Sequence, residues 1–404
     1  YMEMNDGTAL KTVTYDGKIM GLAMPPSNDD RTFLWLRKDW LDKLNVKAPS
    51  TIDELYQLAE DFATKDPNGN GKKDEIGLAL TKNFWGGNAD ISRLFNAYGL
   101  YPNYWVEKDK KLTRGELLPE NKEVLNKLSE LYQKGVIAKD FAIKDPSVEG
   151  DEDIASGKVG ICFGSVNLVG APALVAAHDN TGADWAAYDM PTVTGEPVKA
   201  PAGTRIANFV VAGNKNKNPE AVVKMLNLQL EIVNQNPEYV KDNTFNMSPK
   251  GSMNFWCKPG FGFEVPNITG DTFQKVYSAV QDESKVADLN LSQKEFYDQY
   301  KDYEANKTPA NYAVYTSYKA GGAAEKYVTA EYQDALYLDP AWWPETPAWI
   351  QYGQELYTAV QEYFTNAVVS GDVDKEFDKW TKHFDAFGGK DILKEYNEKY
   401  QEEN

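Results

Sequence analysis

Cysteine and histidine are nearly absent from this sequence. Cys162 and Cys257 are the only cysteines, and His178 and His383 are the only histidines. Two cysteines form at most one bond, so a disulfide framework is excluded; whether the two pair, stay as buried thiols or are unrelated is left open. Two histidines likewise exclude a metal centre built from several imidazoles.

Long apolar runs and clusters of positive charge are also missing. No stretch of about 18 apolar residues occurs, so we expect no transmembrane helix. The 43 Lys and Arg residues are outnumbered by 61 Asp and Glu residues, which gives a net charge of −18 at pH 7. This charge is spread along the chain, which argues against binding to nucleic acid or to an anionic membrane, because both require clustered basic residues.

The sequence lacks the motifs of common catalytic sites. It contains no G-x-S-x-G, no G-x-x-x-x-G-K-[ST] and no H-E-x-x-H, and "GFGFEV" lacks the third glycine of a dinucleotide fingerprint. A glycoside hydrolase needs only two carboxylates beside a sugar, so it stays open as an alternative to a binding protein. A surface module that adheres to polysaccharide is a second alternative.

Apolar residues are plentiful and follow the periods of helices and strands. With 404 residues, 42% of them hydrophobic, the chain can form two domains with full cores. Segment 49–64 predicts a helix that begins with a capping box of Thr51 and Glu54, and segment 347–400 predicts a helical tail broken at "SGD" and "GG". Strand-like runs alternate with such helices, which indicates an α/β protein with mostly parallel sheets.

The segment "KDPNGNGKKDEIG", residues 65–77, places oxygen-bearing side chains on alternate positions. In an EF-hand-type loop, positions 1, 3 and 5 donate side-chain oxygens to a cation, and position 7 donates its backbone carbonyl. A lysine can therefore occupy position 7, and Gly71 at position 6 allows the sharp turn. The pattern predicts a structural Ca²⁺ site with the residues Asp66, Asn68, Asn70, Lys72, Asp74 and Glu75.

This loop departs from a complete EF-hand at its end. Position 12, where an EF-hand has a bidentate glutamate, is Gly77, and no second helix is expected to follow. We therefore expect a structural cation rather than a calcium switch. The alternative is a solvated turn in which Asp and Asn side chains cap their own backbone.

Residues 35–80 resemble extracellular solute-binding protein family 1 of ABC importers. The segment reads "WLRKDWLDKLNVKAPSTIDELYQLAEDFATKDPNGNGKKDEIGLAL". The resemblance is strongest to the large lipoproteins of Firmicutes and to alginate-binding proteins. Four later segments resemble the same family in the same order: "ELYQKGVIAKDF", "IASGKVGICFG", "NPEAVVKMLNL" and "FDKWTKHFDAFGGKDILKEYNEKY".

The resemblance implies two α/β lobes with a sugar-binding cleft between them. It places residues 1–35 and 206–338 in an N-lobe, and residues 36–205 and 339–404 in a C-lobe that carries the calcium loop. It also implies that the first βα units of the N-lobe, on the order of a hundred residues, stand outside this sequence. It further implies a monomeric, extracytoplasmic, usually lipid-anchored protein that delivers an oligosaccharide to ABC permease subunits.

Sugar recognition requires aromatic planes for stacking and polar groups at the rim. The chain has 10 Trp and 24 Tyr but few arginines, so loop tryptophans and rare arginines are the natural candidates. Core packing is the competing interpretation for each Trp, and an ion pair between lobes for each Arg. The candidate ligand-binding residues are Arg31, Trp85, Asn88, Phe163, Asn167, Arg205, Trp256, Trp342, Trp343 and Trp349.

Overall fold

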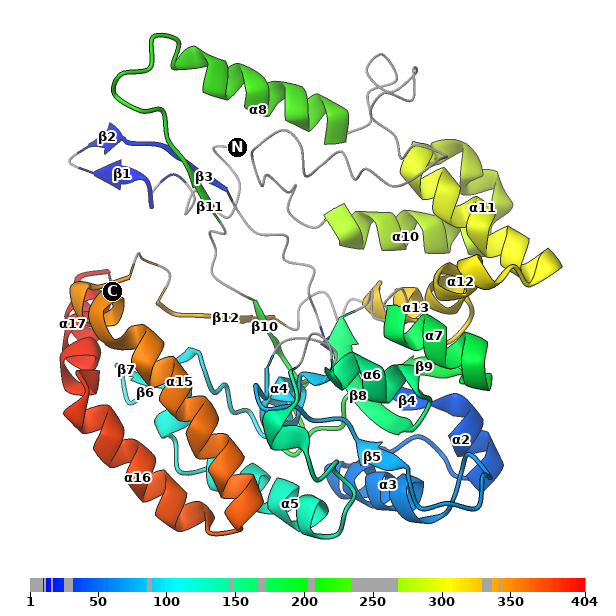
Figure 1. Ribbon diagram of the computed structural model, residues 1–404. Helices are drawn as coiled ribbons and strands as arrows, with labels where there is room; N and C mark the ends of the chain where they lie inside the picture. The colour runs from blue at the N-terminus through cyan, green and yellow to red at the C-terminus, as the bar shows by residue number, and fades with distance from the viewer. Residues whose placement is uncertain are drawn as a thin grey trace. The chain divides into compact units, whose positions relative to one another are not determined.

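The computed structural model describes residues 10, 12–15, 17–24, 32–85, 89–145, 149–165, 172–202, 208–233, 268–328, 336–341, 343 and 345–403. The chain divides into two compact units (Figure 1). One consists of Tyr1–Asp30, Ala202–Tyr297 and Trp342–Pro344, and the other of Arg31–Pro201, Asp298–Ala341 and Glu345–Asn404.

The second unit is built around a four-stranded sheet of order β5–β8–β4–β9. Its strands are β4 (Thr32–Arg37), β5 (Ile76–Leu78), β8 (Val159–Ser165) and β9 (Trp185–Tyr188). Strand β4 reads TFLWLR, and its four apolar residues are all buried. A continuous apolar run of this kind is typical of a central strand that is covered on both faces.

The sheet is mixed rather than mostly parallel, which corrects one detail of the sequence prediction. Strands β5 and β8 run parallel, but β4 runs antiparallel to both β8 and β9. Thr32 lies opposite Ser165 and Leu34 lies opposite Tyr188, so β4 begins at the end of the sheet where β8 and β9 finish. Strand β4, the first strand of this unit, therefore runs antiparallel to β8 and β9. The α/β class itself is confirmed, since helices pack around this sheet.

Helix α3 (Ile52–Thr64) forms as the sequence predicts. The Glu54 amide donates to Thr51 Oγ1 at 3.2 Å, and the Thr51 amide donates to Glu54 Oε2 at 3.2 Å, which completes the capping box. The apolar face of α3 packs on β5 and β8. A Cβ on Gly77 would stand 2.0 Å from the carbonyl oxygen of Ala59, so only glycine allows β5 to approach α3 this closely.

Three C-terminal helices complete the second unit. Helix α15 (Pro347–Ser370) packs against α16 (Val373–Ala386), α17 (Gly389–Glu403) and the earlier helix α5 (Asn121–Gln133), as Figure 1 shows in orange, red and cyan-green. Gly371 ends α15 with a left-handed φ of 74°. The predicted breaks at "SGD" and "GG" are confirmed.

Shorter elements fill the rest of the second unit. They are α2 (Lys38–Leu44), α4 (Ser92–Ala97), β6 (Trp105–Lys108), β7 (Lys111–Arg114), η3 (Gly115–Leu117), η4 (Phe141–Ile143), α6 (Glu149–Ala155), α7 (Pro172–Thr181), η8 (Pro309–Asn311), α12 (Tyr312–Tyr318) and α13 (Ala323–Tyr327). Strands β6 and β7 form an antiparallel hairpin, and β10 (Ala200–Ala202) pairs with β12 (Leu336–Leu338).

The first unit contains two small antiparallel pairs and several helices. Strand β1 (Thr14–Tyr15) pairs with β2 (Lys18–Ile19), and β3 (Leu22–Met24) pairs with β11 (Asn208–Val210). Gly17 lies in the turn between β1 and β2 and has a φ of 71°. The helical elements of this unit are α8 (Glu220–Val233), α10 (Ile268–Gln281), η7 (Glu283–Asp288) and the first part of α11 (Leu291–Asn306).

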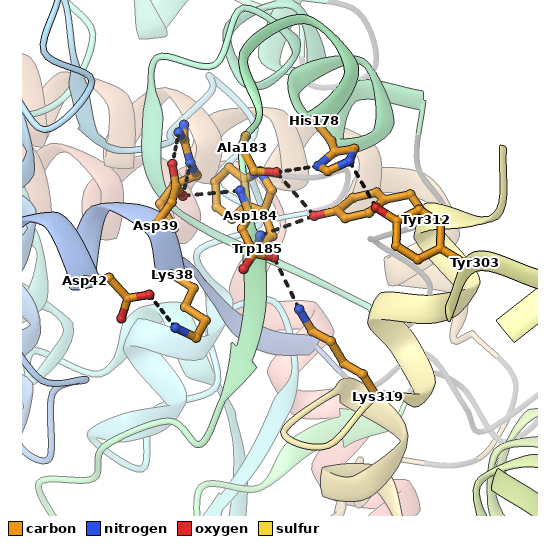
Figure 2. Close-up of polar contacts among 11 residues, drawn as sticks. Lys38, Asp39, Asp42, His178, Ala183, Asp184, Trp185, Tyr303, Tyr312 and Lys319 are labelled. Atoms are coloured by element: carbon orange, nitrogen blue, oxygen red, sulfur yellow. Dashed lines mark hydrogen bonds and ion pairs between the residues drawn. The ribbon is translucent and has the colours of Figure 1, made fainter. Parts of the chain in front are cut away.

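Residues 298–338 belong with the second unit, whereas the sequence-based division placed 206–338 in the first lobe. Figure 2 shows the contacts that tie them to β9. The hydroxyl of Tyr312 donates to the carbonyl of Ala183 at 3.2 Å, and Lys319 pairs with Asp184 at 3.2 Å. The Tyr312 ring also stacks on His178 of α7 at 3.5 Å between centroids. These partners lie more than a hundred residues away in sequence, so local patterns could not reveal them.

Within the described residues, no helix combines the length and apolar character needed to cross a membrane.

Candidate functional site

In the loop between α3 and β5, Asp and Asn side chains accept hydrogen bonds from the loop's own backbone amides. Asp66 accepts hydrogen bonds from the amides of Asn70 (3.0 Å) and Gly71 (3.1 Å), and Asn70 Oδ1 accepts one from the Lys72 amide (2.7 Å). Asn68 Oδ1 also accepts from the Asn70 amide, at 2.8 Å. Gly71 has a φ of 75°, as the expected sharp turn requires. These bonds match a turn in which Asp and Asn side chains cap their own backbone.

Two carboxylates at the end of the loop have different surroundings. Asp74 accepts from the Asn70 side-chain amide at 3.0 Å and pairs with Lys158 at 3.2 Å; these contacts, the Asn70 bond first, lower its pKa. Glu75 is only 6% exposed, and neither of its oxygens has a hydrogen-bond partner with good geometry among the described residues. Burial raises the pKa of Glu75, and the charges of Asp66 and Asp74 raise it further, while nearby backbone amides oppose the rise.

These residues fit a hard divalent cation. A buried carboxylate without partners is costly, and a cation beside it would remove that cost. Every expected donor is an oxygen, as Ca²⁺ prefers, and Lys72 would contribute only its carbonyl. In the part of the chain that the structure describes, no three Asp, Glu, His or Cys side chains already converge as a metal site. The loop would therefore rely on its amide and carbonyl oxygens as well as on its acids.

Trp85 lies on a short loop after β5 and is half-buried. Its indole Nε1 donates to the hydroxyl of Tyr357 at 3.1 Å, and its ring meets that of Phe364 edge-on at 5.4 Å. Phe84 has a φ of 56°, which a bulky residue rarely adopts, and its ring is fully buried. The turn thus sends Phe84 into the core and leaves Trp85 partly on the surface.

The other described candidates are less open. Phe163 is fully buried in the middle of β8, opposite Leu34, so it is a core residue and not a stacking platform. Trp343 is 7% exposed. Trp349 is half-buried against Trp105, at 6.2 Å between centroids, and under the guanidinium of Arg114 at 4.8 Å. Core packing therefore accounts for more of these side chains than the sequence led us to expect.

Six of the candidate ligand-binding residues lie outside the described residues. They are Arg31, Asn88, Asn167, Arg205, Trp256 and Trp342. Cys257 lies there too, while Cys162 is a buried free thiol whose pKa is raised by burial.

Sequence reasoning missed Tyr357, which contacts Trp85 through both its hydroxyl and its ring. The abundance of tyrosine in the sequence was the only available signal, because Trp85 and Tyr357 are 272 positions apart.

Comparison with known proteins gives a consistent result. Residues 4–232 match the bacterial extracellular solute-binding protein family. The polygalacturonan/rhamnogalacturonan-binding protein YtcQ of Bacillus subtilis is 36% identical over 161 residues, which are 39% of this chain and 30% of YtcQ. The fructooligosaccharide ABC transporter substrate-binding protein FusA of Streptococcus pneumoniae is 37% identical over 109 residues, 26% of this chain and 20% of FusA. The matched part thus spans less than a third of either relative.

Solved structures share the fold over nearly the whole chain. FusA in complex with kestose superposes with a TM-score of 0.61 at 18% identity, covering 97% of this chain and 77% of FusA. The alginate-binding protein AlgQ2 without calcium ion gives 0.59 at 17% identity, covering 98% of this chain and 77% of AlgQ2. Since the family match covers more than half of the chain, the protein belongs to the bacterial extracellular solute-binding proteins.

Proposed function

We propose that the protein is the substrate-binding component of an ABC importer and captures an oligosaccharide without altering it. The family match over residues 4–232 carries this proposal. The printed names of two relatives, one a binder of polygalacturonan and rhamnogalacturonan and one of fructooligosaccharide, support the sugar class. The half-buried Trp85 offers the kind of aromatic face on which sugar rings stack.

We further propose that the loop 66–75 holds a structural Ca²⁺ ion through Asp66, Asn68, Asn70, the Lys72 carbonyl, Asp74 and Glu75. The oxygens of buried Glu75, which have no hydrogen-bond partner among the described residues, support this assignment. A FusA structure described as an EF-hand mutant supports it further, since it shares this fold with a TM-score of 0.61. When bound, the ion would neutralise the negative charge of the loop and lock α3 to β5.

The location and partners follow from the same proposal. The protein would act outside the cytoplasm as a monomer, attached to the membrane by a lipid, and would pass its ligand to permease subunits. Sugar binding would favour a closed form of the protein over an open one. The family is one of binding proteins, so a hydrolase that works through a carboxylate pair is not favoured.

The test is to incubate the 404-residue chain with a panel of oligosaccharides and to follow both heat of binding and products. We expect saturable binding of at least one oligosaccharide and no product after prolonged incubation. Turnover that is lost when one carboxylate is replaced would point instead to the hydrolase. Binding to insoluble polysaccharide without affinity for short oligomers would point to a surface module.

A further inference from the structure

Lys158 places a positive charge on one of the proposed cation ligands. Its Nζ pairs with Asp74 Oδ2 at 3.2 Å, and the other oxygen of Asp74 accepts from the side-chain amide of Asn70 at 3.0 Å. Both oxygens of this carboxylate therefore already have a partner within the protein. Lys158 stands directly before β8, so the positive charge comes from outside the loop 66–75.

The backbone that carries this lysine is held on both sides. The carbonyl of Gly157 accepts from Arg37 Nη1 at 2.7 Å, and Arg37 is only 2% exposed. The carbonyl of Lys158 accepts from the amide of Ile76 at 2.9 Å, where β5 begins to pair with β8. The ammonium group therefore reaches Asp74 from a base that is fixed to the strand next to the loop.

A second lysine approaches the loop without contacting its carboxylates. A Cβ on Gly69 would stand 2.5 Å from Lys43 Nζ, so this ammonium group of α2 lies against the loop backbone. Within the described residues Lys43 forms no ion pair. Lys43 and Lys158 thus bring the same charge to the same loop, but of the two only Lys158 contacts a proposed ligand.

A divalent cation bound by Asp74 would share this carboxylate with the Lys158 ammonium group. An ammonium group and a dication a few ångströms apart repel each other, and even in water this repulsion corresponds to roughly a tenfold change in affinity. The side chain of Lys158 is 43% exposed, so it can also turn partly into solvent and lose some of the repulsion. Lys158 should therefore weaken cation binding by about three- to tenfold.

The same ion pair also benefits the loop. Burial raises the pKa of Glu75, and the charges of Asp66 and Asp74 raise it further, so the carboxylates of the loop repel one another. The Asn70 bond first, and then the contact with Lys158, lower the pKa of Asp74. Lys158 thus offsets part of the repulsion within the loop, although it costs the loop part of its affinity for a cation.

We propose that Lys158 sets the cation affinity of the loop 66–75, because its ammonium group competes with the ion for the carboxylate of Asp74. This inference rests on the proposed Ca²⁺ site and adds a residue outside the loop that regulates it. The affinity of calcium loops depends on the charge that their ligands supply, and a lysine on one ligand lowers that charge.

The first experiment measures the Ca²⁺ affinity of the 404-residue chain by calorimetry after metal has been removed with EDTA. Lys158→Met removes the charge and keeps a side chain of similar length, so it should raise the affinity about three- to tenfold. Lys158→Arg keeps the charge, and its affinity should not rise above that of the parent protein. Lys43→Met is the matched control, and it should change the affinity by no more than about twofold, because an exposed charge without a ligand contact is screened.

The outcomes distinguish this inference from the proposed site. If the parent protein binds Ca²⁺ and the affinity falls or stays the same in Lys158→Met, the role of Lys158 is overturned and the site stands. Equal gains in Lys158→Met and Lys43→Met would show an effect of net charge alone, which would also overturn it. No Ca²⁺ binding by the parent protein would overturn both the site and this inference.

The second experiment follows the thermal unfolding of the same proteins with EDTA and with saturating Ca²⁺. With EDTA, Lys158→Met should unfold at a lower temperature than the parent protein, because Asp74 loses its charged partner. With Ca²⁺ this difference should vanish or reverse, because the variant binds the ion more tightly. An equal difference under both conditions would mean that Lys158 supports the fold without competing with the ion, and would overturn the inference.

Discussion

The loop 66–75 and the surroundings of Trp85 lie in the same unit, but they are assembled in opposite ways. The hydrogen bonds that the loop's own residues make with one another span at most five positions. Trp85 instead packs against Tyr357 and Phe364 of α15, and its hydrogen bond with Tyr357 spans 272 positions. A site formed by one segment depends only on that segment and on the helix and strand that flank it. A site formed by distant segments depends on the packing of the whole unit.

The largest effect is expected from replacing Phe364, because this change should disturb the surroundings of Trp85 and leave the loop 66–75 intact. This side chain is fully buried and supports Trp85 and Phe84, at 5.4 and 5.5 Å between centroids. Phe364→Ala should lower the free energy of unfolding by about 3–5 kcal/mol, because it leaves a cavity. We expect weaker sugar binding but unchanged Ca²⁺ affinity, measured by calorimetry under conditions where the variant is folded.

Ile350→Ala is the control for this variant, since Ile350 lies on the same helix and is 70% exposed. Its unfolding free energy should change by no more than about 0.5 kcal/mol. Equal losses of sugar and Ca²⁺ affinity in Phe364→Ala would show that the two sites are not independent.

The next largest effect concerns the cation. At a Ca²⁺ concentration a hundred times its dissociation constant, binding should raise the free energy of unfolding by about 2.7 kcal/mol. Glu75→Gln should lose most of this gain, because it removes a buried carboxylate whose oxygens have no hydrogen-bond partner in the described part of the chain. Glu152→Gln, at an exposed position on α6, should keep it. A full calcium response in Glu75→Gln, seen in thermal unfolding curves, would remove Glu75 from the ligand set.

The smallest effect is the pH dependence of Glu75 without a cation. The pKa of this group is raised in the folded protein, so its charged form destabilises the fold above that pKa. The penalty should fade as the pH falls through the folded-state pKa and vanish below the ordinary glutamate value. Under chelation, Glu75→Gln should therefore be more stable than the parent protein at pH 7.5, and the difference should shrink toward pH 4.

This pH effect should be smaller than the calcium effect, because the cation removes the same penalty and also adds contacts. Urea unfolding at several pH values measures it. A difference that grows as the pH falls would contradict the raised pKa.

Local patterns predicted local structure well. The capping box of α3, the Gly71 turn and the breaks in the C-terminal helices depend on residues within five positions of each other, and the structure confirms them. The α/β class followed from the alternation of helical and strand-like periods. The direction of β4 did not, because strand pairing depends on where the chain enters the sheet.

The sequence alone could not predict which residues far apart along the chain come into contact. Phe163 follows a strand pattern that does not distinguish an end from a middle, and it proved to be fully buried. Residues 298–338 have helical patterns that fit either unit, and only side-chain partners such as Asp184 for Lys319 decide between them. Trp85 and Tyr357 share no motif and are 272 positions apart, so only the folded chain could bring them together.

Gly77 fixes the distance between the two elements that the loop 66–75 connects. With the Ala59 carbonyl where a Cβ would stand, helix and strand are clamped almost backbone to backbone at the loop's exit. A Ca²⁺ ion bound in the loop 66–75 would hold together α3 and β5, two elements that are already in contact. Its binding energy would then appear as resistance to heat and proteolysis rather than as movement.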